Sequence, residues 1–123
     1  MNNFGAIGWV DLTCENAAAV MDFYQKVAGW KASEVRVEDY DDFVMQKSDT
    51  GEPVAGICHQ RGANRDIPNQ WLIYIQVEDL AASIDACEKS GGKVLSPPRN
   101  LGSYGRMCII EDPAGAIAAL LQP

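Results

Sequence analysis

The sequence lacks any apolar run long enough to cross a lipid bilayer, which takes roughly 18 residues. Its longest apolar runs, WLIYI at 71–75 and AIAALL at 116–121, have the length of strands. Positive charge is also scarce, since 10 Lys and Arg residues oppose 17 Asp and Glu residues and leave a net charge of −7. This excess of carboxylates repels phosphate backbones and anionic lipids, so we expect neither nucleic acid nor a membrane surface as a partner.

Cysteine and histidine, the usual ligands of structural zinc, are few and scattered. The four cysteines form no Cys-x-x-Cys pair, and His59 is the only histidine. The N-terminal residues show no basic segment followed by an apolar run and a cleavage site, so we expect no secretory signal and a cytoplasmic protein with reduced thiols. A chain of 123 residues can bury a core as one domain without disulfides or a structural metal.

The chain contains an internal repeat at an offset of 63 residues. The segments WVDLTCENAAAVMDFYQKVAG and LIYIQVEDLAASIDACEKSGG share six identities in 21 pairs, where composition alone predicts about one or two. The ends of a predicted helix repeat as well. Asn16 and Asp79 are N-cap residue types, and Gly29 and Gly92 suit the left-handed position that follows a helix.

Within each copy the hydrophobic period changes from two to 3.6, which predicts a strand followed by an amphipathic helix. The polar segment 60–70 has no period and contains Gly, Asn and Pro, so we expect a linker there. It separates a module of residues 5–59 from a module of residues 71–122 within a single domain of residues 1–123. Further alternating stretches follow the helices at 34–38, 41–47 and 53–59, and at 93–96, 105–111 and 115–121, so that the predicted order is βαβββ twice.

The chain resembles the vicinal oxygen chelate superfamily in three sequence segments, which occur in the order FYQKVAGW, VEDLAASIDACEKSGGKVL and EDPAGAIAALLQ. This is the group of glyoxalase I, the bleomycin-resistance proteins and the extradiol dioxygenases, and the resemblance covers residues 5–122. It implies an α+β fold in which two tandem βαβββ modules form a half-open β cup with the helices packed on the outside. It also allows a homodimer, because modules of this family pair within one chain or between chains.

The metal enzymes of that superfamily hold a divalent ion with four side chains, two from each module. Carried over by position, these places fall on Trp9, Gly56, Leu72 and Ala119. None of these residue types offers a side-chain donor that binds a divalent metal. We therefore expect no metal and no cofactor.

Strand alternation predicts which side chains line the cup. If Trp9 and Leu72 face it, then Asp11, Tyr74 and Gln76 lie on the same faces of their strands. Apolar walls with a few polar groups suit a small-molecule pocket. The alternative is that Asp11 and Gln76 are simply solvated on an exposed sheet. The predicted ligand contacts are Trp9, Asp11, Cys58, Leu72, Tyr74, Gln76, Tyr104 and Arg106.

The last contacts depend on other signals. Cys58 is in phase with the cup-facing position two residues before it, whereas the adjacent His59 points to the opposite face of the strand. We therefore expect a cup-lining thiol rather than a Cys-His nucleophile. Tyr104 and Arg106 belong to a turn-rich loop at the rim, where they are placed to close over a ligand.

Two functions of different classes follow from this set. The first is a glyoxalase- or bleomycin-resistance-like protein that binds a small organic molecule without the usual divalent metal, with a flat or cationic ligand favoured by aromatic walls and a carboxylate. The second is a glyoxalase- or lyase-like enzyme in which Asp11 is the general base and Tyr74 or Arg106 stabilises negative charge. The familiar reactions of the superfamily need a Lewis acid, so the sequence favours binding. A pure interaction module would instead require an exposed apolar patch.

Overall fold

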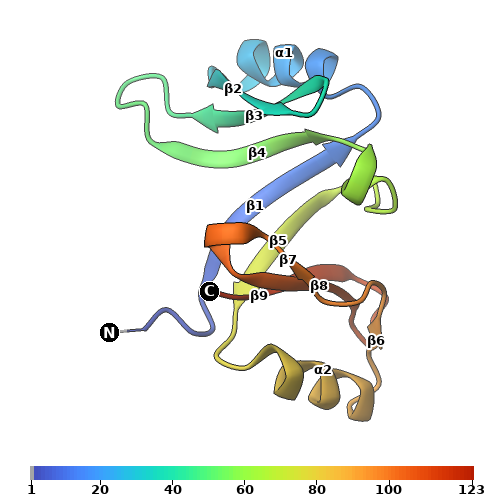
Figure 1. Ribbon diagram of the computed structural model, residues 1–123. Coiled ribbons are helices and arrows are strands. Elements are labelled where there is room, and N and C mark those ends of the chain that lie inside the picture. Colours follow the sequence, from blue (N-terminus) through green and yellow to red (C-terminus); the bar gives the residue numbers. More distant parts are fainter. Residues whose placement is uncertain (1) are drawn as a thin grey trace. The chain divides into compact units, whose positions relative to one another are not determined.

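The computed structural model describes residues 2–123, which fold as two units (Figure 1). One unit comprises residues 10–71, and the other comprises residues 2–9 together with residues 72–123. Within the described residues the chain forms nine strands and two α-helices, which confirms the predicted α+β class. Neither helix is long and apolar enough to cross a membrane.

The unit of residues 10–71 contains the first βαβββ module. Its elements are β1 (Ile7–Cys14), whose first three residues belong to the other unit, α1 (Ala17–Ala28), β2 (Lys31–Val37), β3 (Tyr40–Gln46) and β4 (Pro53–His59). The strand order is β2-β3-β4-β1. Strand β3 pairs antiparallel with both β2 and β4, whereas β1 runs parallel to β4.

The other unit contains the second module. Its elements are β5 (Trp71–Gln76), whose first residue belongs to the unit of residues 10–71, α2 (Leu80–Lys89), β6 (Lys93–Val94), β7 (Arg99–Asn100), β8 (Arg106–Glu111) and β9 (Ile117–Gln122). The strand order is β5-β9-β8-β6, with β7 also paired to β8. The predicted strand at 93–96 is therefore shorter and ends at Val94, and a further short strand, β7, follows it. Pro97 and Pro98 stand between the two strands, and proline has no N–H to donate to a neighbouring strand.

The parallel strand pairs confirm the internal repeat. Asp11 pairs with Gly56 across β1 and β4, and Tyr74 pairs with Ala119 across β5 and β9. Each residue of the second pair lies 63 positions after its counterpart in the first. The first and last strands of the two modules therefore have the predicted register.

The antiparallel hairpins depart from this offset. Val44 of β3 lies opposite Gly56, whereas Ile109 of β8 lies opposite Ala119. Ile109 is 65 positions after Val44, so β8 is displaced by two residues relative to the repeat. The turn after β8 is shorter than the turn after β3, and the pairing of β3 with β4 also contains a register shift between Met45 and Gln46. The gap-free offset therefore fails for the third strand of each module.

The helix starts follow the sequence signals. The side chain of Asn16 accepts a hydrogen bond from the backbone N–H of Ala19 at 3.2 Å, and Asp79 accepts one from Ala82 at 3.1 Å. Gly29 ends α1 with a left-handed φ of 71°. Both predicted N-caps and the first predicted C-terminal glycine are therefore confirmed.

The predicted role of Gly92 is wrong. Helix α2 ends at Lys89, and Gly91, with a φ of 89°, takes the left-handed conformation. Gly92 is required for a different reason, because a Cβ there would lie 2.6 Å from the sulfur of Cys87 and 3.0 Å from the carbonyl oxygen of Glu111. The glycine permits close approach of the chain to α2 and β8 rather than a turn in the backbone.

Each helix packs on one face of its own strands. In the first module the buried core between α1 and the sheet is formed by Leu12, Cys14, Ala17, Phe43, Met45 and Ile57. In the second module the core beside α2 is formed by Leu80, Cys108 and Leu120. The opposite face of the second module is buried too, at Leu72, Tyr74, Met107, Ile109 and Ala119.

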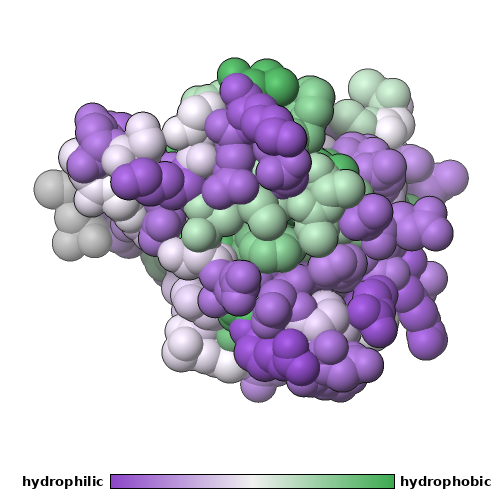
Figure 2. Space-filling model, turned by 90° about the horizontal axis from the view of Figure 1, so that it is seen from above, coloured by the Kyte–Doolittle hydropathy of each residue, from purple (hydrophilic) through white to green (hydrophobic). Residues whose placement is uncertain are grey.

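Some apolar side chains remain at the surface. Phe23 and Val27 on α1 are 54% and 66% exposed. Seen from above, the molecule shows apolar surface gathered between polar regions (Figure 2). The exposed surface of α1 therefore carries apolar side chains.

Candidate ligand-binding site

The sheet of the first module carries polar side chains on the face turned away from α1. The core residues of β1, β3 and β4 pack toward α1, so their neighbours along each strand point to the other face. On that face Thr13 pairs with Cys58, and the register of β3 and β4 places Asp42 opposite Cys58. Asp11 lies two residues before Thr13 and shares the same side. We call Asp11, Thr13, Asp42 and Cys58 the polar face.

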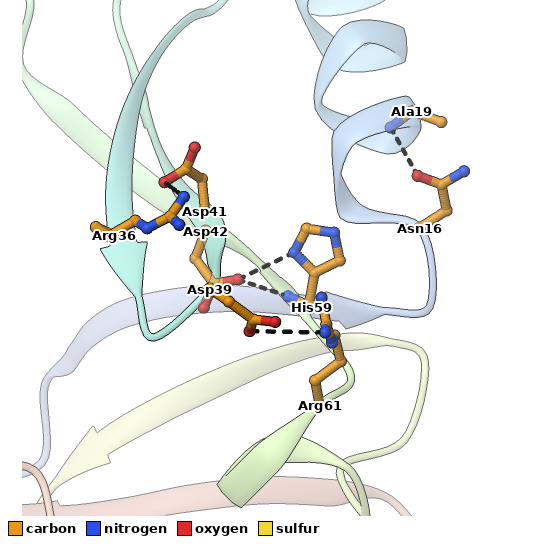
Figure 3. A network of polar contacts seen from close by, with 8 residues as sticks. All are labelled: Asn16, Ala19, Arg36, Asp39, Asp41, Asp42, His59 and Arg61. Carbon is orange, nitrogen blue, oxygen red and sulfur yellow. Dashed lines mark hydrogen bonds and ion pairs between the residues drawn. The ribbon is translucent and has the colours of Figure 1, made fainter.

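Asp42 is the most strongly constrained carboxylate of the polar face. Its side chain is only 11% exposed, and one of its oxygens, Oδ1, accepts the backbone N–H of His59 at 2.8 Å. The same oxygen lies 3.3 Å from Nδ1 of the His59 ring (Figure 3). A buried carboxylate is stable only with such partners. By contrast the adjacent Asp41 pairs with Arg36 at 3.5 Å, where both side chains are far more exposed.

The thiol of Cys58 lies within the influence of two carboxylates. Burial raises its pKa well above the usual range, and the negative charges of Asp11 and Asp42 raise it further. The thiol also shares a hydrogen bond with Asp42, in which the S–H is the donor. The raised pKa favours the protonated, neutral thiol of Cys58 at physiological pH.

The ring of His59 is held among other side chains of the same module. Its centroid lies 5.4 Å from that of Tyr40, with the two rings nearly perpendicular. The guanidinium of Arg61 lies 4.3 Å from the Tyr40 ring centroid and forms an ion pair with Asp39 at 3.8 Å. Burial and the charge of Asp42 raise the pKa of the Tyr40 hydroxyl, which keeps it neutral. His59 thus contacts Asp42 and Tyr40, and its ring lies near the same carboxylate as the Cys58 thiol.

The eight predicted contacts differ widely in exposure. Trp9, Asp11, Cys58 and Gln76 are half-buried. Leu72 and Tyr74 are core residues with exposures of 1% and 6%, whereas Tyr104 is 75% exposed and Arg106 is also exposed. The structure brings Asp11 and Cys58 together within one module. Ligand contacts from all eight residues stay predictions.

Tyr74 and Arg106 lie on opposite faces of their sheet. Tyr74 pairs with Ala119 and Arg106 pairs with Gln122, and these two positions of β9 point to opposite sides. The side chain of Gln122 accepts the backbone N–H of Leu80 at 2.8 Å, so its face is the one toward α2. The prediction that one or the other stabilises negative charge stays a prediction.

Sequence reasoning missed Asp42 and the role of His59. The signal was the pair Asp41-Asp42 at the start of the predicted strand 41–47. Two consecutive carboxylates in a strand must point to opposite faces, so one of them had to lie on the polar face. The contact between Asp42 and His59 spans 17 residues of sequence and has no local signature.

The metal positions of the superfamily do not fit a metal here. Strand pairing places Gly56 beside Asp11 and Ala119 beside Tyr74, as the repeat predicted. The residues at the four positions, Trp9, Gly56, Leu72 and Ala119, carry no oxygen, sulfur or imidazole donor. Throughout residues 2–123, His, Cys, Asp and Glu side chains form no group of three or more that could hold a metal ion.

The chain is similar to several curated proteins. It is 34% identical over 119 residues to CFP32 from Mycobacterium tuberculosis, which is named as a glyoxylase; the match covers 96% of this chain and 46% of that protein. It is 31% identical over 128 residues to the anthracycline biosynthesis protein DnrV from Streptomyces peucetius, with 94% and 46% covered. The chain thus spans about half the length of the curated relatives it matches.

Solved structures share the fold at low sequence identity. A methylmalonyl-CoA epimerase variant from Streptomyces coelicolor, in complex with 2-nitronate-propionyl-CoA, matches with a TM-score of 0.60 and 18% identity over 97% of this chain and 94% of that one. A hypothetical protein from Bacillus halodurans matches with a TM-score of 0.63 and 8% identity over 95% and 93%. Residues 6–119 match the sequence model of a single family. The chain therefore belongs to the Glyoxalase/Bleomycin resistance protein/Dioxygenase superfamily.

Proposed function

We propose that the chain binds a small organic molecule at the polar face, without a divalent metal at the superfamily's usual position. The observation that carries this proposal is the composition of that face. Where metal enzymes of the superfamily have a ligand, the last strand of the first module has Gly56, and beside it lie the carboxylate of Asp11 and the protonated thiol of Cys58. These groups can orient a polar ligand directly.

The charges of the polar face favour a cationic or hydrogen-bond-donating ligand group. Asp11 is half-buried, and Asp42 adds a second negative charge beside Cys58. An anion would be repelled by both carboxylates, and the whole chain carries a net charge of −7. A cation near Asp11 would gain from the partly desolvated setting.

The relatives support a small organic ligand. One curated relative is named as a glyoxylase and another as an anthracycline biosynthesis protein, and the epimerase of similar fold was solved with a CoA-linked molecule. We favour binding over catalysis for two reasons. Burial and two neighbouring carboxylates raise the pKa of Cys58, which favours the neutral thiol, and the four superfamily metal positions offer no side chains to hold a Lewis acid.

The test is a thermal-shift screen of the whole chain against flat cationic drugs and small keto and hydroxy acids. Hits are then titrated into wild type, Asp11→Asn and the matched control Asp41→Asn, which removes a more exposed carboxylate of the same module. We expect cationic hits to bind at least tenfold more weakly to Asp11→Asn and as tightly as wild type to Asp41→Asn, because Asp11 lies on the polar face and Asp41 does not.

Two results would contradict the proposal. If both variants bind every hit as wild type does, the polar face is not the ligand site. If Asp11→Asn abolishes turnover of a metabolite while its affinity is unchanged, the enzyme hypothesis with Asp11 as general base replaces it.

A further inference from the structure

The unit of residues 10–71 contains a hollow on the opposite side of the sheet from the polar face. Its volume is about 270 Å³. Val10 and Ala55 lie in phase with the core residues Leu12 and Ile57, which pack toward α1. Trp30, Val54 and Trp71 also pack against that core cluster, so the hollow is separate from the site proposed above. Its lining residues are Val10, Trp30, Val54, Ala55 and Trp71.

Two tryptophans form the aromatic walls of this hollow, which we call the tryptophan pocket. The ring centroids of Trp30 and Trp71 lie 6.1 Å apart, and the ring planes meet at 80°. The indole N–H of Trp71 donates a hydrogen bond to the hydroxyl of Tyr24 at 3.2 Å. Because its polar atom is occupied, the ring is fixed in place and offers an apolar surface.

Comparison of the two modules shows that the βαβββ fold does not require these tryptophans. Sixty-three positions after Trp30 the second module has Lys93, and 63 positions before Trp71 the chain has Gly8. The remaining lining positions carry apolar residues in both modules; Val54, for example, corresponds to Ile117. The aromatic walls are thus an addition to one module, whereas the apolar floor is common to both.

We propose that the tryptophan pocket is a second binding site, which takes a flat, uncharged aromatic ring system. Perpendicular indole rings present one face and one edge, and both geometries suit contact with a further aromatic ring. No charged side chain lines the pocket, so a ligand charge buried there would have no partner. A volume of about 270 Å³ lies near the lower limit of pockets that hold drug-sized molecules. The occupant is therefore a compact molecule of a few fused rings.

The probe for the test is N-phenyl-1-naphthylamine, a neutral aromatic dye whose fluorescence rises in apolar surroundings. The filling variant is Val54→Phe, and the matched control is Ile117→Phe, which adds the same ring at the repeat-related position of the other module. We expect dye affinity to fall at least tenfold in Val54→Phe and to change less than twofold in Ile117→Phe. Naphthalene should displace the dye, whereas 1-adamantanol, with the same number of carbons in a globular shape, should not.

A second variant covers the case in which Val54→Phe disturbs the core. Trp30→Leu keeps an apolar side chain and removes the aromatic wall, so dye binding should fall at least tenfold while the circular dichroism spectrum is unchanged. Asp11→Asn should leave dye binding as in wild type, which separates this site from the polar face. Equal binding by wild type and Trp30→Leu would overturn the proposal. Equal displacement by 1-adamantanol, or dye binding that disappears as the protein self-associates, would overturn it too.

Discussion

Removal of the Asp42 side chain should destabilise the chain far more than removal of its neighbour Asp41. In Asp42→Ala the backbone N–H of His59 loses its acceptor at 2.8 Å, and the thiol of Cys58 loses its hydrogen-bond partner. A hydrogen bond to a charged group contributes about 1.5–3 kcal/mol, and a buried donor left unpaired costs about 1–3 kcal/mol. Release of the buried charge offsets part of this loss. We therefore expect a net loss of about 2 kcal/mol.

Asp41→Ala is the matched control, because it deletes the same side chain one residue away. Its ion pair with Arg36, at 3.5 Å, joins side chains that are 32% and 65% exposed. Solvent screens such pairs, so the expected loss is about 0.5 kcal/mol or less. Asp42→Asn provides an intermediate case, since its amide oxygen can still accept from His59.

The assay is urea unfolding followed by circular dichroism, with free energies from linear extrapolation. From most to least stable, the expected order is wild type and Asp41→Ala together, then Asp42→Asn, and last Asp42→Ala. If Asp42→Ala is no less stable than Asp41→Ala, the buried carboxylate does not organise the end of β4 and the assignment of the polar face is wrong.

Further predictions concern the thiols and the helix ends. The pKa of Cys58 is raised above its usual value of 9.0, so as the pH rises the unfolded chain loses this proton before the folded chain does. The contribution of Cys58 to the free energy of unfolding should therefore be complete below about pH 9. Above that pH it should fall by about 1.4 kcal/mol per pH unit. Urea titrations at several alkaline pH values should show a shallower fall in Cys58→Ala, and an unchanged slope would contradict the burial of this thiol. Asn16→Ala and Asp79→Ala should each cost about 1 kcal/mol in thermal or urea unfolding, because each removes an N-cap acceptor. Losses below about 0.3 kcal/mol in both would count against these caps.

The fold was largely predictable because its signals are local or periodic. The change of hydrophobic period and the caps Asn16 and Gly29 are read within a few residues. The offset of 63 then carries one module onto the other and predicts strand register in the parallel pairs. It failed for β8, because the register of a hairpin follows its turn length, and the two turns differ.

The site was less predictable because its contacts cross strands. Asp42 and His59 meet 17 residues apart, and the sequence contains no pattern that joins them. Trp30 follows α1 and Trp71 lies at the end of the unit of residues 10–71, and their contact depends on how α1 packs on the sheet. By contrast, the lack of metal-binding residue types at the four superfamily positions was visible at once, because it depends only on side-chain chemistry.

The most direct test of the central claim is a calorimetric titration of the strongest organic hit into wild type, before and after removal of divalent metals with EDTA, and into Asp11→Asn. The account predicts the same dissociation constant before and after EDTA and an affinity at least tenfold lower in Asp11→Asn. Loss of binding after EDTA, with recovery when zinc or magnesium is added back, would contradict metal-free binding at the polar face.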